Sequence, residues 1–124
     1  DTLDLTRPVG LMLIAVLHFI HGDGAAAPVV GRLLDALPAG SYLVATHATS
    51  DFGTPEQQAL YRQLVEQGRS DVWTRSRDEF EGLFAGLELV EPGVVPASEW
   101  RPEPGADIGE RSDINLWTAV GRKP

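Results

Sequence analysis

An apolar run over residues 9–17, followed by a helical segment and a second apolar run, constrains the fold of this chain more than any other feature. The first run lies between Pro8 and a Gly-Asp-Gly loop at residues 22–24. A short run with such a stop predicts a strand covered on both faces, with a buried helix as the alternative. Residues 28–37 carry apolar side chains at helical spacing after Pro28, and residues 42–46 form a second apolar run. The series predicts a right-handed βαβ unit with parallel strands.

Two N-terminal capping motifs predict two further helices. Thr54 is followed by Pro55 and then by Gln57, three residues after the threonine. Ser76 stands three residues before Glu79 in the same way. A hydroxyl side chain at this spacing from a glutamine or glutamate can satisfy the free N–H groups of a helix start.

The last part of the chain predicts two more strands. Residues 87–95 are mostly apolar but contain a Pro-Gly bend at residues 92–93, so we expect a kinked strand. Residues 97–113 are rich in proline, glycine and charge, which predicts a long loop, and residues 114–120 predict the final strand.

Composition indicates one globular α/β domain over residues 1–124, with 43% hydrophobic and 23% charged residues. Eighteen acidic and ten basic residues give a net charge of −8, which makes nucleic acid and anionic membranes unfavourable partners. Cysteine is absent, in keeping with a cytoplasmic protein, and the longest apolar stretch is too short to span a bilayer. The chain begins at Asp1 and not at methionine, so we expect it to be part of a longer protein.

Four short segments resemble a family of actinobacterial S-adenosyl methyltransferases that was long known as a domain of unknown function. They are Ala-Val-Leu-His-Phe-Ile at residues 15–20, Leu-Asp-Ala-Leu-Pro-Ala-Gly-Ser-Tyr-Leu-Val at 34–44, Gly-Leu-Glu-Leu-Val-Glu-Pro-Gly at 86–93 and Ala-Val-Gly-Arg-Lys at 119–123. The resemblance implies a Rossmann-like class I methyltransferase fold with strand order 3-2-1-4-5-7-6 and helices on both faces. This chain would supply the carboxyl-terminal half, in the order 4-5-7-6 with the last strand antiparallel.

The resemblance also implies what is missing. In such enzymes a glycine-rich turn after strand 1 and an acidic residue after strand 2 hold S-adenosyl-L-methionine. Neither is found in this sequence, which has no G-x-G-x-G after a strand. We therefore expect part of a methyltransferase that acts on a small-molecule acceptor and is inactive alone. The alternative is a non-catalytic half-fold that serves as an interaction or dimerisation module.

Three residues at the end of the first predicted strand are candidates for contact with the cofactor: Leu17, His18 and Phe19. In related O-methyltransferases a Leu-His segment at this place carries the general base, and a neutral imidazole suits that role. His18 is therefore the catalytic candidate. The alternative is that it only shapes the wall of the cofactor pocket.

Four further residues are candidates for substrate binding because they follow strands at the same sheet edge: His47, Trp73, Trp100 and Arg101. An aromatic ring and a guanidinium can stack on or clamp a substrate, and the alternative is an ordinary amphipathic cover over the core. His18, His21 and His47 could also converge as metal ligands. Their spacing is weak evidence, and no metal is predicted.

The first strand also predicts an association. Without strand 1 beside it, residues 9–17 would form an apolar edge with unpaired backbone groups, which is a template for strand pairing. We expect either a homodimer that pairs this strand with its copy or coverage by the missing amino-terminal half. In the second case Met12, Ile14 and Val16 would pack against another segment.

Overall fold

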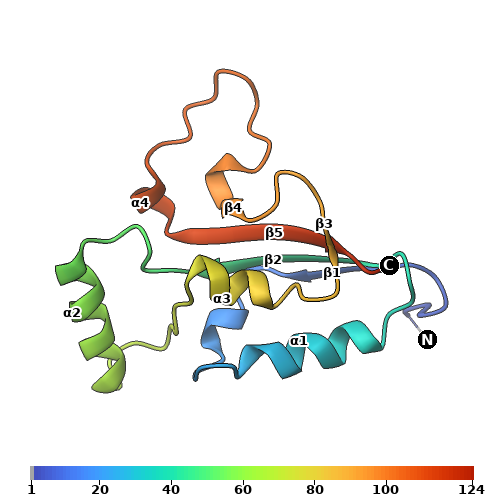
Figure 1. The fold of residues 1–124 in the computed structure, drawn as a ribbon, viewed down its shortest axis with the longest axis horizontal. Helices are drawn as coiled ribbons and strands as arrows, with labels where there is room; N and C mark the ends of the chain where they lie inside the picture. The colour runs from blue at the N-terminus through green and yellow to red at the C-terminus, as the bar shows by residue number, and fades with distance from the viewer. Residues whose placement is uncertain (1) are drawn as a thin grey trace.

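A mixed five-stranded sheet forms the centre of the computed structural model, which describes residues 2–124 (Figure 1). The strands are β1 (Gly10–Leu13), β2 (Tyr42–Ala48), β3 (Glu88–Leu89), β4 (Val95–Pro96) and β5 (Leu116–Arg122). The order is β1-β2-β5-β3, and β4 also pairs with β5. β1 and β2 are parallel, whereas β5 is antiparallel to β2, β3 and β4. The predicted order and the antiparallel last strand are confirmed.

Helical segments connect these strands. They are η1 (Leu17–Phe19), α1 (Ala26–Asp35), α2 (Pro55–Glu66), α3 (Arg77–Gly82), η2 (Ala97–Glu99) and α4 (Arg111–Ile114), of which η1 and η2 are 3-10 turns. Both predicted capping boxes are present. Gln57 N donates to Thr54 Oγ1 at 3.2 Å, and Thr54 N donates to Gln57 Oε1 at 2.8 Å. Ser76 and Glu79 make the equivalent pair at the start of α3.

All four predicted strands have different bounds in the structure. β2 continues to Ala48, two residues beyond its predicted end at residue 46. β1 ends at Leu13, because the chain turns at Ala15, whose φ is +56° and whose N–H donates to Thr46 Oγ1. The kinked strand is divided into β3 and β4 on either side of the bend. The last strand begins at Leu116, since α4 ends at Ile114 and Asn115 follows it in a left-handed conformation, and it continues to Arg122.

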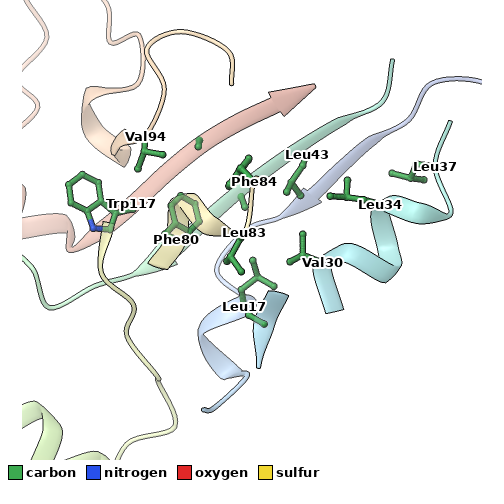
Figure 2. Close-up of a cluster of buried hydrophobic side chains, with 13 residues drawn as sticks. Leu17, Val30, Leu34, Leu37, Leu43, Phe80, Leu83, Phe84, Val94 and Trp117 are labelled. Atoms are coloured by element: carbon green, nitrogen blue, oxygen red, sulfur yellow. The ribbon is translucent and has the colours of Figure 1, made fainter. Parts of the chain in front are cut away.

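The core lies on one face of the sheet. Alternate residues of β2 and β5 on that face pack against α1 and α3 (Figure 2). The cluster consists of Leu17, Ala26, Val30, Leu34, Leu37, Leu43, Ala45, Phe80, Leu83, Phe84, Val94, Trp117 and Ala119. α2 buries none of its residues and lies beyond the carboxyl end of β2 (Figure 1).

The other face of β1 is open. Met12, Ile14 and Val16 are 67%, 45% and 47% exposed, while Leu11 and Leu13 turn toward the core. Within residues 2–124 the first strand is thus covered on one face only, and α1 and α3 lie on the same face instead of opposite ones (Figure 1). No helix in this part of the chain is long and apolar enough to cross a membrane.

The last residues of the chain connect α1 to the sheet. Lys123 Nζ donates to the carbonyl oxygens of Leu34 and Leu37, both at 2.7 Å. The backbone N–H of Lys123 donates to Ser41 O at 2.7 Å, and Gly40 N donates to Lys123 O at the same distance. A cation at the end of a helix satisfies carbonyl groups that have no partner within it.

Candidate active site

The turn Leu17–Phe19 lies directly after β1, beside the carboxyl end of β2. Its three side chains have different environments. Leu17 is part of the core, and His18 is buried with its ring 5.9 Å from that of His47. Phe19 is 57% exposed, and its ring meets that of His18 edge to face at 4.6 Å. Of the three predicted cofactor-binding residues, Phe19 presents the most side-chain surface.

His18 is held through one ring nitrogen. The backbone N–H of Ala48 donates to His18 Nδ1 at 3.4 Å, so a neutral His18 carries its proton on Nε2. Burial lowers the pKa of His18 and favours this neutral form. In this arrangement Nε2 is a hydrogen-bond donor and not a proton acceptor.

His47, predicted to bind substrate, is completely buried, and both of its ring nitrogens have partners inside the protein. Nδ1 donates to the carbonyl oxygen of Ala48 at 2.8 Å, and Nε2 accepts from Arg75 Nη1 at 2.9 Å. Burial, and to a lesser degree the charge of Arg75, lowers the pKa of His47 to about 4. His47 is therefore neutral near pH 7 and supports the site through its hydrogen bond with Arg75.

Arg75 joins this histidine to the segment that follows β1. Its guanidinium donates to the carbonyl oxygens of Leu17 at 3.4 Å, Ile20 at 3.0 Å and Gly22 at 2.9 Å. The residue is only 3% exposed, and burial lowers its pKa. The planar fork of an arginine can reach several acceptors at once, and here it fixes the backbone on both sides of His18. Sequence reasoning missed Arg75.

Trp73 lies next to the same segment. Its backbone N–H donates to the carbonyl oxygen of His18 at 2.7 Å, and its indole ring lies 5.8 Å from the ring of His21. The side chain lines a cavity of about 370 Å³ beside α2. Trp73 is thus the predicted substrate-binding residue that the structure brings to the His18 segment and to a cavity.

Trp100 and Arg101 lie elsewhere, after η2. The Arg101 guanidinium stands 5.5 Å from the Trp100 ring and donates from Nε and Nη2 to the carbonyl oxygen of Glu91, at 3.2 Å and 2.6 Å. Arg101 lines a separate cavity with Pro92 and Pro102, and neither Trp100 nor Arg101 lines the cavity at Trp73. The four predicted substrate-binding residues therefore do not form one cluster.

The three imidazoles do not converge as metal ligands. His47 uses both nitrogens as described above, His18 Nδ1 accepts from Ala48, and His21 Nε2 contacts the carbonyl oxygen of Asp71. In the part of the chain that the structure describes, no three histidine, cysteine, aspartate or glutamate side chains are grouped as a metal site.

The family model described as S-adenosyl methyltransferase matches residues 1–124, the whole chain. The chain belongs to this family. A crystal structure of a DUF574 family protein from Streptomyces avermitilis is 42% identical to this family member, covers all of it and has a TM-score of 0.86. A candidate methyltransferase from Thermobifida fusca is 37% identical over 98% of the chain, with a TM-score of 0.79. Among curated proteins none matches.

More distant structures share the fold. The N-methyltransferase NodS of Bradyrhizobium japonicum, crystallised with S-adenosyl-L-homocysteine, is 16% identical over 93% of this chain, with a TM-score of 0.57. These neighbours give the family member a class I methyltransferase fold, of which it holds a part. It spans 47% of the Streptomyces relative and 45% of the Thermobifida relative, slightly under half of each.

Proposed function

We propose that this chain is the carboxyl-terminal half of an S-adenosyl-L-methionine-dependent methyltransferase that acts on a small-molecule acceptor. The observation that carries the proposal is the fixation of the segment around His18. Backbone groups of Ala48 and Trp73 and the side chain of Arg75 all hold it at the carboxyl end of β1. In open α/β sheets this is the edge at which ligands bind.

The residues present fit one side of the cofactor. Phe19 offers an exposed aromatic ring on a turn that is itself held in place, as an apolar wall for adenine requires. Bound S-adenosyl-L-methionine would supply an electrophilic methyl group. Contacts to the ribose and the amino-acid part fall to the segment that this chain does not contain, because the glycine-rich turn and the acidic residue are not in its sequence.

His18 is proposed as a wall and hydrogen-bond donor at this edge. The geometry that supports this role is the N–H of Ala48 pointing at Nδ1, which leaves the proton of a neutral ring on Nε2. Methyl transfer by in-line displacement depends chiefly on positioning, and an acceptor that is already nucleophilic needs no base.

The experiment compares variants in the full-length protein by titration calorimetry with S-adenosyl-L-homocysteine and by methyl transfer. Phe19→Ala should weaken the binding of S-adenosyl-L-homocysteine, a product inhibitor, by about tenfold. The reason is that the exposed ring becomes buried on binding and contributes apolar contact area. Leu33→Ala, which shortens an exposed side chain on α1, is the control and should change nothing.

His18→Ala separates the two roles of the imidazole. A pocket wall predicts similar losses in inhibitor affinity and in turnover. A loss confined to turnover would contradict the wall and favour a base. If the unaltered full-length protein binds no S-adenosyl-L-homocysteine, the enzymatic proposal fails, and the non-catalytic interaction module takes its place.

The amino-terminal half is also the proposed partner of β1. β1 is an edge strand, and Met12, Ile14 and Val16 expose apolar surface beside it. In both relatives the part outside the matched region is slightly longer than this chain. A segment of that size can pair with β1 and cover its open face. Pairing of β1 with a second copy is the alternative outcome.

A further inference from the structure

Two adjoining cavities separate α2 from the carboxyl edge of the sheet. Their volumes are about 370 and about 580 Å³, in the range of small-molecule sites. Four residues line both of them: Ser50, Gln58, Tyr61 and Thr74. Their chemistry is neutral and polar, and the hydroxyls of Ser50 and Thr74 lie 3.5 Å apart.

Among the four residues that line both cavities, Tyr61 has a hydroxyl group without a hydrogen-bond partner in residues 2–124. That hydroxyl is buried. Buried polar groups nearly always have a partner, so a hydroxyl without one calls for an explanation. A ligand that occupies the cavities and hydrogen-bonds to Tyr61 supplies it.

The charge around the smaller cavity restricts that ligand. Three carboxylates, those of Asp23, Glu66 and Glu79, line it together with one guanidinium, that of Arg62. The surplus of negative charge disfavours an anionic molecule. Trp73 adds an aromatic surface to the same cavity. The lining therefore suits an uncharged or positively charged molecule with an apolar body.

We infer that these adjoining cavities form the methyl-acceptor site and that the Tyr61 hydroxyl hydrogen-bonds a non-anionic, hydroxyl- or amine-bearing acceptor. The inference rests on the proposed function. It places the acceptor beside the cofactor edge, because Trp73 lines the cavity with its ring and donates from its backbone to the carbonyl oxygen of His18.

Three probes of similar size test the chemical class in the full-length protein with S-adenosyl-L-homocysteine bound. They are 4-hydroxybenzyl alcohol, tyramine and 4-hydroxyphenylacetate, which share a phenol and differ in charge. We expect the neutral and cationic probes to bind at least about tenfold more tightly than the anionic one. Equal or tighter binding of the anion, or no binding of any probe at millimolar concentration, would overturn the inference.

Tyr61→Phe tests the hydrogen bond. It should weaken the binding of the neutral and cationic probes by about tenfold, since a hydroxyl that pairs with the ligand is lost. It should also raise the Tm of the ligand-free protein by a few degrees, because the unpartnered hydroxyl is removed. Tyr42→Phe, on an exposed tyrosine of β2, should change neither value.

One result at Tyr61 would count against the site. If Tyr61→Phe lowers the Tm and leaves the probes unaffected, the hydroxyl serves only an internal water, and the inference is overturned. Titration of S-adenosyl-L-homocysteine into the unaltered protein separates failure of the acceptor site from failure of the proposed function. Inhibitor binding without probe binding refutes the acceptor site alone, whereas loss of inhibitor binding in the unaltered protein refutes the proposed function.

Discussion

Arg75 donates from Nη1 to Nε2 of His47 at 2.9 Å, and this bond joins a buried cation to a neutral imidazole instead of a carboxylate. The imidazole can accept only while it is unprotonated, because protonation would place two positive groups together. The remaining donors of Arg75 reach carbonyl oxygens on either side of His18. The protonation state of His47 is thereby linked to the backbone of the candidate site.

Stability should fall in mild acid because of His47. Its pKa is about 4 in the folded chain against 6.5 for the free side chain, so below pH 6.5 the unfolded state takes up the proton first. The contribution of His47 to the free energy of unfolding is fully present above pH 6.5. It should decrease by up to about 3 kcal/mol as the pH falls to about 4. Urea denaturation at a series of pH values measures this.

His47→Gln is the informative variant, since an amide can still donate and accept in place of the ring. It should flatten the acid dependence, whereas His21→Gln removes an exposed imidazole and serves as the control. An unchanged pH dependence in His47→Gln would show that other groups cause the effect.

Removal of the Arg75 fork should loosen the segment around His18. Arg75→Met leaves the carbonyls of Ile20 and Gly22 without their donor, and we expect a loss of about 2–4 kcal/mol in the free energy of unfolding. Arg75→Lys should restore only part of it, because an ammonium cannot span the same acceptors. Thermal denaturation of the full-length protein measures the loss, and Arg69→Met, at an exposed arginine, should be neutral.

Affinity for S-adenosyl-L-homocysteine gives a second measurement of Arg75. If the arginine positions the segment around His18 for cofactor binding, Arg75→Lys should lower the affinity for S-adenosyl-L-homocysteine. The measurement is made at a temperature at which the variant is still folded. A stable variant with unchanged affinity would limit Arg75 to a structural role.

The 124-residue chain alone should associate through β1. Exposed apolar residues beside an unpaired edge strand favour pairing with a second chain. Size-exclusion chromatography with light scattering should therefore find species heavier than 13.4 kDa. The double variant Ile14→Lys, Val16→Lys should be largely monomeric, while Val29→Lys, Leu33→Lys on the exposed side of α1 should not. A stable 13.4 kDa species of the unaltered chain would contradict this prediction.

Gly121 should not tolerate a side chain. A methyl group there would come within 2.8 Å of Phe84 Cδ2 and 3.1 Å of Leu87 Cβ, so Gly121→Ala should destabilise the protein by about 1–3 kcal/mol. Gly31→Ala on α1 meets no atom within 4 Å and should be stabilising by about 0.5–1 kcal/mol. Equal Tm values for the two variants would contradict the packing described for β5.

Local signals in the sequence were enough for several elements. The caps at Thr54 and Ser76 involve partners three residues away, so their geometry is decided within one helical turn. The sheet order came from the family resemblance and not from periodicity. Periodicity could also have placed His47 correctly, because it shares one face of β2 with Leu43 and Ala45, both fully buried.

Other features depend on contacts that no local pattern encodes. Arg75 meets carbonyl groups 53 to 58 residues away, and nothing in its own surroundings distinguishes it from an exposed arginine. The early end of β1 depends on a positive φ at Ala15, a residue type that rarely adopts it. The Tyr61 hydroxyl has no hydrogen-bond partner within residues 2–124 because of the position of α2 in the fold, and the local sequence does not encode that position.

The position of β5 bears on the order in which the molecule can be assembled during synthesis. This strand is made last among the five, yet it lies between β2 and β3 and pairs with every residue of β2 from Tyr42 to Ala48. While the ribosome is still adding residues before Leu116, β2 has a bare edge and α1 lacks its contact from Lys123. Of the strand pairs described above, a nascent chain at that stage can form only β1–β2, because β3 and β4 pair with β5. This half of the sheet can therefore close only after translation has passed β5.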